Sequence, residues 1–148
     1  MFEDHDHEYR VGIGTDLHRF ASGRKLMLGG VYVPCEMGLL GHSDADVVLH
    51  AVMDAMLGAA GYGDIGDMFP DTGPIYTGAD SKALMLVVRD RLQHNRWLVV
   101  NADVTIHIEQ PRLEPFKLQI KRAIASLLSI DFNAVNVKAK TNEGCDAV

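Results

Sequence analysis

The sequence predicts an α+β protein in which a mixed β-sheet is covered by helices on one face, forming a two-layer sandwich. Segments with the period-two pattern of strands precede, separate and follow three segments with the 3.6-residue apolar period of helices. The 148 residues are 47% hydrophobic, which is enough for one core, and no linker rich in Pro, Ser or Gly divides them. We therefore expect one domain over residues 1–148, with the element order β-β-β-α-α-β-α-β.

The first strand is expected in the segment RVGIGTDLHRF, residues 10–20. The odd positions from 11 to 17 are mostly apolar and share one face, which we expect to contact the core. The even positions share the other face and are Gly12, Gly14, Asp16 and His18. A carboxylate and an imidazole therefore lie together beside two positions without side chains, which leaves room for a ligand.

Four further strands follow the same period. A hairpin is expected over residues 25–34, with its turn at Gly29 and Gly30, and the last two strands fall within 97–111 and 134–144.

Three helices are predicted from apolar periodicity and capping residues. The first follows Ser43, which can cap it, has Asp46 at the capping-box distance and stops at Gly61. The others cover 81–95, after the cap Asp80, and 114–129. The Gly-, Asp- and Pro-containing segment between the first two helices predicts an irregular loop over 63–73.

Composition excludes several classes of protein. The longest apolar runs, such as residues 83–88, are far shorter than the roughly 20 residues of a membrane span. A net charge of −6 argues against nucleic acid as the main partner. The cysteines, Cys35 and Cys145, form no C-x-x-C pair, and the acidic start lacks a signal-peptide pattern, so we expect a cytoplasmic protein without a disulfide framework.

Two residues of the first strand and one residue of the first helix could bind a metal. A catalytic zinc ion needs about three nitrogen or oxygen ligands and an open position. Asp16 and His18 supply two ligands, and His50 supplies the third, flanked one turn away by Asp46 and Asp54, either of which could hold its far ring nitrogen. On spacing alone, a hydrogen-bonded structural histidine is the simpler interpretation of His50. The same residue types also occur in the facial triad of non-haem iron oxygenases, but in a different order.

Weaker signals lie at three loops. His42 precedes the first helix, where unpaired N–H groups favour an anion. Thr141 and Glu143 follow the last strand, and residues 109–115 form a Pro-containing loop after another strand. Each of these segments also fits a plain turn.

Four segments in order, GIGTDLHRF, GLLGHSDADVVLHAVMDAMLGAAGYGDIGDMFPDT, DVTIHIEQPRLEP and VNVKAKTNEG, resemble the 2-C-methyl-D-erythritol 2,4-cyclodiphosphate synthase family. The resemblance covers nearly the whole chain. It implies a zinc ion held by Asp16, His18 and His50, and a second ion, Mg²⁺ or Mn²⁺, held by Glu143 and bridging a diphosphate. The implied reaction converts 4-diphosphocytidyl-2-C-methyl-D-erythritol 2-phosphate to the 2,4-cyclodiphosphate and releases CMP.

The resemblance also assigns roles to residues. His42 and Thr141 would stabilise the transition state, and Ser43 would contact phosphate. Ribose would bind to residues 64–66 and cytosine to residues 108–114. A mobile substrate loop would consist of residues 69–73. The implied substrate-binding residues are Asp16, His18, His42, Ser43, Asp64, Ile65, Gly66, Phe69, Pro70, Asp71, Thr72, Gly73, Ile108, Glu109, Gln110, Pro111, Arg112, Leu113, Glu114, Lys140, Thr141, Asn142 and Glu143. Lys140 departs from the threonine that many members carry there.

The family further implies a homotrimer with active sites between subunits, an isoprenoid ligand on the threefold axis, and a final strand after Val148. Two other functions share some of these features. A metal-dependent phosphoesterase would use the same ligands with metal-bound water as the nucleophile. A non-catalytic trimeric protein that binds nucleotide or isoprenoid would hold its metal structurally, although such sites usually have four protein ligands.

Overall fold

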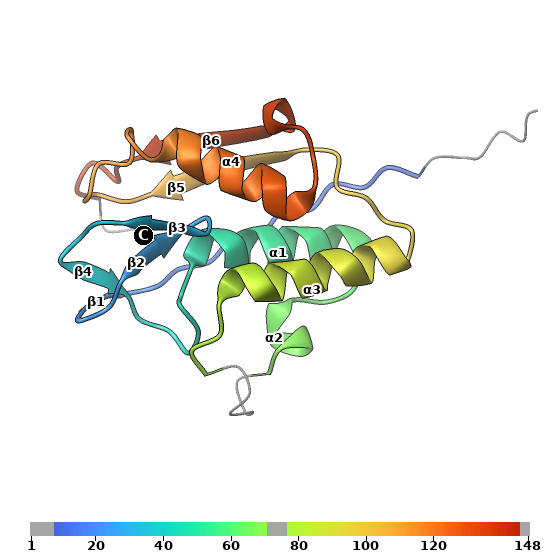
Figure 1. Cartoon of the computed structure of the whole chain (residues 1–148), viewed down its shortest axis with the longest axis horizontal. Coiled ribbons are helices and arrows are strands. Elements are labelled where there is room, and N and C mark those ends of the chain that lie inside the picture. The colour runs from blue at the N-terminus through green and yellow to red at the C-terminus, as the bar shows by residue number, and fades with distance from the viewer. Residues whose placement is uncertain (1–7, 71–76, 146–148) are drawn as a thin grey trace, which may run out of the picture.

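The computed structural model describes residues 8–70 and 77–145. Figure 1 labels the elements in chain order. They are β1 (Phe20–Ser22), β2 (Leu26–Leu28), β3 (Val31–Val33), β4 (Met37–Leu39), α1 (Val47–Ala60), α2 (Ile65–Met68), α3 (Ser81–His94), β5 (Ala102–His107), α4 (Lys117–Leu128) and β6 (Val135–Lys140), with a 3₁₀ turn at Phe132–Ala134. Three expected site residues, Asp71, Thr72 and Gly73, lie outside the described residues.

The α+β class is confirmed, but the described strands do not form one mixed sheet. They form three two-stranded sheets, in which β1 pairs with β4 and β2 with β3, both antiparallel, and β5 pairs with β6 in parallel. Helix α4 packs on β6, while α1 and α3 lie side by side in the neighbouring layer (Figure 1). A parallel pair needs a crossover, and α4 supplies it between β5 and β6.

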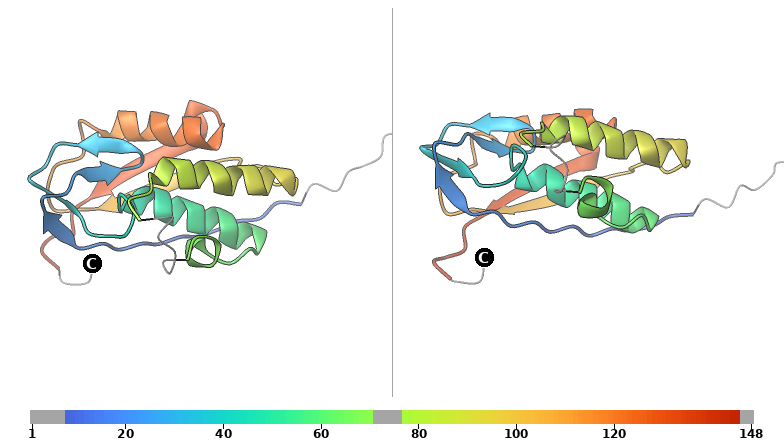
Figure 2. Two further views of the ribbon diagram at one scale, coloured as in Figure 1. Left: turned by 60° about the horizontal axis from the view of Figure 1, so that its bottom comes forward. Right: turned by 90° about the horizontal axis from the view of Figure 1, so that it is seen from below.

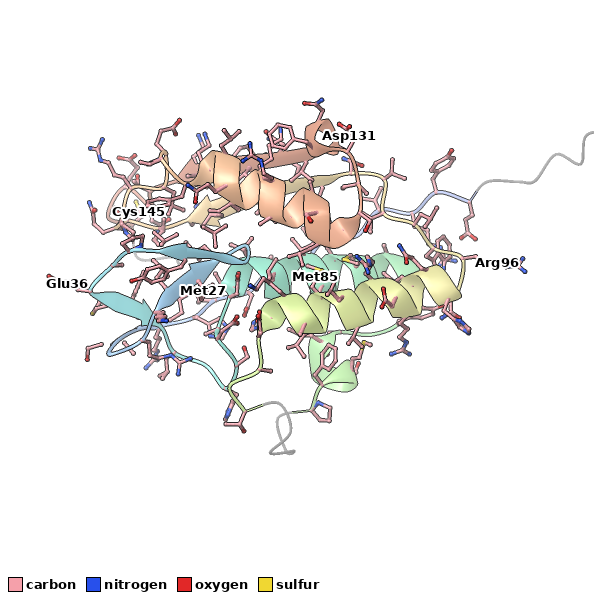
Figure 3. The ribbon with its side chains drawn as sticks, in the orientation of Figure 1. Met27, Glu36, Met85, Arg96, Asp131 and Cys145 are labelled. Atoms are coloured by element: carbon pink, nitrogen blue, oxygen red, sulfur yellow. The ribbon has the colours of Figure 1, made fainter. Side chains whose placement is uncertain are left out.

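The core lies where these layers meet. Met85 of α3, labelled in Figure 3, is completely buried, as are Leu49, Leu57, Ile120 and Ile124. Leu26 and Val33 of the β2–β3 hairpin also have no exposed surface. The hairpin thus closes the core at the end where α1 begins. No helix in the described part of the chain is long and apolar enough to cross a membrane.

Helix α1 begins after Asp46, three residues later than Ser43, the cap that the sequence suggested. The Asp46 carboxylate accepts the N–H of Leu49 at 3.0 Å, and also the N–H groups of Gly29 at 2.8 Å and Gly30 at 2.6 Å. It therefore caps the helix and closes the hairpin turn at the same time. The predicted stop at Gly61 is confirmed, because this residue has the left-handed backbone of a helix end.

The other helices differ from prediction mainly at their ends. Asp80 caps α3, as expected. Helix α4 starts at Lys117 instead of residue 114, because Pro115 disfavours the helical conformation of the residue before it. The loop predicted over 63–73 contains the one-turn helix α2, with a capping box between Asp64 and Asp67.

The predicted first strand is wrong in two respects. Residues 8–19 form no regular strand, and β1 begins only at Phe20. The face expected to contact the core is exposed, with exposed fractions of 97% for Val11, 87% for Ile13 and 69% for Leu17. The glycine face of the segment lies against α1 instead, as the contacts at Gly12 and Gly14 show.

We predict that Asp46→Ala lowers the free energy of unfolding by about 3 kcal/mol, because it removes a helix cap and leaves two further backbone N–H groups unpaired. Asp80→Ala is the matched control, since its carboxylate caps α3 through Lys82 alone and should cost about 1 kcal/mol. Urea denaturation followed by circular dichroism measures both. Equal losses in the two variants would contradict the double role of Asp46.

Candidate metal centre

The segment that carries two of the predicted ligands runs along α1 (Figure 2). Its backbone approaches the helix so closely that a Cβ at Gly12 would lie 1.8 Å from the carbonyl oxygen of Ala55. A Cβ at Gly14 would lie 1.9 Å from that of Ala51. Each step of two residues along the segment therefore matches one turn of the helix. One more step brings Asp16 to the first turn of α1, where its Oδ2 lies 3.0 Å from Nδ1 of His50.

The structure brings the three predicted metal ligands together. The Oδ2 atom of Asp16 lies 2.9 Å from Nε2 of His18 and 3.0 Å from Nδ1 of His50. One ligand atom from each residue lies within 4.8 Å of the other two. The side chains keep between 11% and 25% of their surface exposed, so the cluster is accessible from one side.

The outer nitrogens of both histidines are held by hydrogen bonds. Nδ1 of His18 lies 2.7 Å from the carbonyl oxygen of Leu40 and must carry a proton, because a carbonyl only accepts. Nε2 of His50 lies 3.0 Å from Oγ of Ser81 and 3.2 Å from Oγ of Ser43. The remaining nitrogen of each ring faces Asp16. Two imidazole nitrogens and one carboxylate form a donor set that suits a zinc ion with an open position, so the residues fit this metal.

The expected carboxylate partners of His50 lie elsewhere. Asp46 is occupied by the hairpin turn, and Asp54 accepts the N–H of Ile65 at 2.8 Å. Serine hydroxyls take the place of these carboxylates. The prediction placed the partner on the same helix face, whereas the fold supplies it from the loop before α1 and from α3.

The charge of Asp16 is favoured by its surroundings. Burial disfavours the carboxylate, but the contact with the His50 ring, the charge of His18 and the N–H of Leu17 outweigh it and hold the pKa of Asp16 below its ordinary value. An ionised Asp16 is the form that binds a metal.

A second cluster joins the segment after β6 to the segment after β5. Oε1 of Glu109 accepts the N–H of Asn142 at 2.7 Å and that of Gly144 at 3.3 Å. Thr141 donates its hydroxyl to Glu143 at 3.0 Å. The segment implied to hold cytosine therefore lies next to the segment implied to hold the second metal. Among the described residues, however, Glu143 is not part of the ligand group around Asp16.

A pocket of about 560 Å³ lies beside this second cluster. It opens between β1, the connection from β3 to β4, and the loop after β5. The residues that line it are Phe20, Pro34, Cys35, Glu36, Met37, Glu109, Gln110 and Pro111.

Comparison with known proteins decides the family. A family model described as the YgbB family matches residues 9–148. The chain belongs to the YgbB family. It is 54% identical over 134 residues to the 2-C-methyl-D-erythritol 2,4-cyclodiphosphate synthase of Chlorobaculum tepidum, covering 90% of this chain and 85% of the relative. It is 52% identical over 136 residues to the enzyme of that name from Bordetella pertussis, covering 92% and 84%.

A solved structure shares the fold of this YgbB-family chain. The structure described as 2C-methyl-D-erythritol-2,4-cyclodiphosphate synthase in its CDP-bound form superposes with a TM-score of 0.86 at 33% identity. The match covers 91% of this chain and 90% of that chain. The resemblance inferred from four sequence segments is thereby confirmed.

The remaining predicted residues of this YgbB-family site lie on four segments. Asp64 caps α2, and Ile65 and Gly66 form its first turn, which is tied to α1 through Asp54. His42 is exposed before α1, and its carbonyl accepts the N–H of Gly78 at 2.6 Å. The other predicted residues described here are Phe69 and Pro70 after α2, Arg112, Leu113 and Glu114 before α4, and Lys140 at the end of β6.

Sequence reasoning missed Ser81, Asp44 and Gly41. Ser81 is fully buried and contacts His50, and it donates its hydroxyl to Asp44. A Cβ at Gly41 would lie 3.1 Å from the His18 ring, so this glycine leaves room for the ring. The block GLLGHSDAD, which contains Gly41 and Asp44, offered a signal for these two residues, whereas Ser81 lies outside it.

We predict that Gly14→Ala weakens zinc binding at least tenfold and lowers the free energy of unfolding by about 3 kcal/mol, because the new Cβ overlaps the helix backbone and pushes Asp16 away from His50. Gly58→Ala, on the same helix, is the control. Its Cβ would meet only the carbonyl oxygen of Ile13 at 4.0 Å, and it should gain about 1 kcal/mol. Competition with a chromophoric chelator gives the zinc affinity. Wild-type affinity in Gly14→Ala would contradict the packing argument.

Proposed function

We propose that this protein is a 2-C-methyl-D-erythritol 2,4-cyclodiphosphate synthase that forms the 2,4-cyclodiphosphate from 4-diphosphocytidyl-2-C-methyl-D-erythritol 2-phosphate and releases CMP. The observation that carries the proposal is the convergence of Asp16, His18 and His50 within 4.8 Å, in a chain 54% identical to a relative of that name. The enzyme is a metal-dependent phosphorus–oxygen lyase of isoprenoid precursor synthesis.

In the proposed reaction, an oxygen of the substrate 2-phosphate forms a bond to the β-phosphorus. The bond between the β-phosphorus and the oxygen that bridges it to the α-phosphorus breaks, and CMP leaves with the electron pair. The nucleophile is already an anion, so the protein needs no general base. Its residues align the two phosphates and exclude water.

The metal ligands have a defined part in this scheme. Asp16, His18 and His50 would hold zinc, Glu143 would hold Mg²⁺ or Mn²⁺, and the two cations would offset the repulsion between the phosphate groups. Ser43 would contact phosphate through its hydroxyl, whose Oγ also accepts the N–H of Ala45 at 3.1 Å. His42 and Thr141 would stabilise the transition state.

The nucleotide would contact α2 and the segment after β5. We assign ribose to Asp64, Ile65 and Gly66, cytosine to residues 108–114, and the substrate loop to residues 69–73. The CDP-bound form named for the solved relative supports a cytidine diphosphate ligand. Backbone groups after Pro111 would read the base edge, which allows an acidic protein to bind a nucleotide without a basic surface.

We further infer a homotrimer whose active sites lie between subunits. Exposed apolar side chains on two segments support it, with Val11 and Ile13 on one segment and Leu98 and Val100, 74% and 66% exposed, on the other. The guanidinium of Arg10 lies 4.6 Å from the ring centre of Trp97, so the two segments are neighbours. Such a surface is costly in water and is suited to burial against other subunits. An apolar cavity on the threefold axis would accept an isoprenoid ligand.

We predict cyclisation without hydrolysis when the zinc- and magnesium-loaded protein is incubated with the substrate in ¹⁸O-water. A tethered phosphate at high effective concentration outcompetes water in an enclosed site. Phosphorus NMR should show the cyclic diphosphate and CMP without the isotope shift of ¹⁸O, and the His50→Ala variant should leave the substrate intact. A main product carrying ¹⁸O would indicate a phosphoesterase instead.

We also predict that two inactive variants recover activity when mixed. His50→Ala lacks the metal half, and Thr141→Ala combined with replacement of residues 111–113 lacks the pocket half. If the subunits reassort at equal ratio, each half of a site is intact with a probability of one half. About a quarter of the sites should then be active, as expected for a ring interface between two different surface patches. Activity that stays at background after subunit exchange, verified by mass spectrometry, would reject the shared site.

A further inference from the structure

One buried polar residue beside the candidate metal centre has no role in the proposed reaction. Among the described residues, the buried polar side chains are Asp46, His50 and Ser81. Asp46 closes the hairpin turn, and His50 is a metal ligand. Ser81, the first residue of α3, has no exposed surface, and its Oγ lies 3.0 Å from Nε2 of His50.

The hydrogen-bond partners of Ser81 define the direction of each proton. Its hydroxyl donates to Oδ1 of Asp44, and its backbone N–H donates to Oδ2 of the same carboxylate at 3.1 Å. The N–H of Asp46 also donates to Oδ1 of Asp44, at 3.2 Å. A carboxylate that receives three donors only accepts, and a hydroxyl has one proton to donate. Ser81 must therefore accept from His50, and Nε2 of His50 must carry the proton.

We propose that Ser81 and Asp44 are positioning residues, which fix His50 in the tautomer that is protonated at Nε2 and presents the lone pair of Nδ1 to the metal. The inference rests on the proposed zinc site and adds to it the residues that orient one ligand. A partner of this kind on the outer ring nitrogen fixes the ring orientation and increases the basicity of the ligand. In many metal sites a carboxylate contacts the outer ring nitrogen directly. Here the hydroxyl of Ser81 lies between the His50 ring and the carboxylate of Asp44.

Ser43 cannot replace this relay. Its Oγ also lies near Nε2 of His50, at 3.2 Å, and it accepts the N–H of Ala45. No carboxylate among its described partners receives its proton, so its hydroxyl can serve as donor or acceptor toward the ring. Ser43 therefore permits both tautomers of His50, whereas Ser81 permits one.

The backbone holds the relay in place on both sides. The N–H of Asp44 donates to the carbonyl of Ala79 at 3.1 Å, and the N–H of Gly78 donates to that of His42 at 2.6 Å. These bonds join the loop before α1 to the start of α3. Ser81 and Asp44 consequently keep their distance to His50 through main-chain contacts as well as through their side chains.

The test compares the variants Ser81→Ala and Ser81→Thr with Asp80→Ala, which alters the start of the same helix without touching His50. Chelator competition measures zinc affinity, and nitrogen-15 NMR of the histidine rings in the zinc-loaded protein reports the tautomer. We expect Ser81→Ala to lose about 10- to 100-fold in zinc affinity and to lose the slowly exchanging Nε2 proton of His50. Ser81→Thr retains the hydroxyl, so it should keep both the zinc affinity and the slowly exchanging Nε2 proton. Asp80→Ala should bind zinc within about threefold of wild type.

Asp44→Asn provides a second variant if Ser81→Ala does not fold, because it keeps the size of the side chain and removes its acceptor-only character. Like Ser81→Ala, Asp44→Asn should lower the zinc affinity. Wild-type zinc affinity and an unchanged Nε2 proton in a folded Ser81→Ala or Asp44→Asn variant would overturn the relay. A different result would show that the proposed zinc site itself is wrong. Wild-type protein would then bind less than one zinc per chain, or His50→Ala would bind zinc as tightly as wild type does.

Discussion

The close approach of residues 12–14 to α1 is the constraint on which the candidate site depends. Two backbones meet here without intervening side chains, because glycines stand at 12 and 14 and alanines at 51 and 55. The contact converts separation along the sequence into proximity, since Asp16 and His50 are 34 residues apart and 3.0 Å from each other. A larger residue on either side would leave each ligand on its own element but break the cluster. The glycines therefore serve the metal centre without contacting it.

The sequence allowed the ligand set to be predicted more securely than its surroundings. Alternation along a strand-like segment correctly placed Asp16 and His18 on one side, together with the glycines, and helical spacing correctly directed His50 inward. Periodicity shows which residues share a face but not which face is covered. Val11 and Ile13 are apolar and were expected in the core, yet both are exposed in the single chain, on the surface that we propose to be covered in a trimer. Residues 8–19 likewise form no β-ladder with the described part of the chain.

Residues that act through tertiary contacts left no periodic signal. Ser81 and Asp44 stand 37 residues apart, and only the docking of α3 against the loop before α1 makes them partners of His50. The same applies to Asp46, which has the spacing of a helix cap but also binds the turn of a hairpin. Local propensity predicts one partner for such a side chain, whereas the fold supplies several. For this reason the residue that caps α1 is Asp46 and not Ser43.

The carboxylates around His50 explain how an acidic chain can present a site for phosphates. Burial raises the pKa of Asp46, an effect opposed by the three backbone N–H groups that its carboxylate accepts. Asp44 accepts from Ser81 and from the N–H of Asp46, and Asp54 accepts from Ile65. Each of these three carboxylates is thus directed at donors within the protein, which leaves Asp16 as the carboxylate of the metal cluster. One carboxylate and two neutral imidazoles do not cancel the charge of a divalent cation, so a centre that held such a cation would keep a net positive charge beside the proposed diphosphate site.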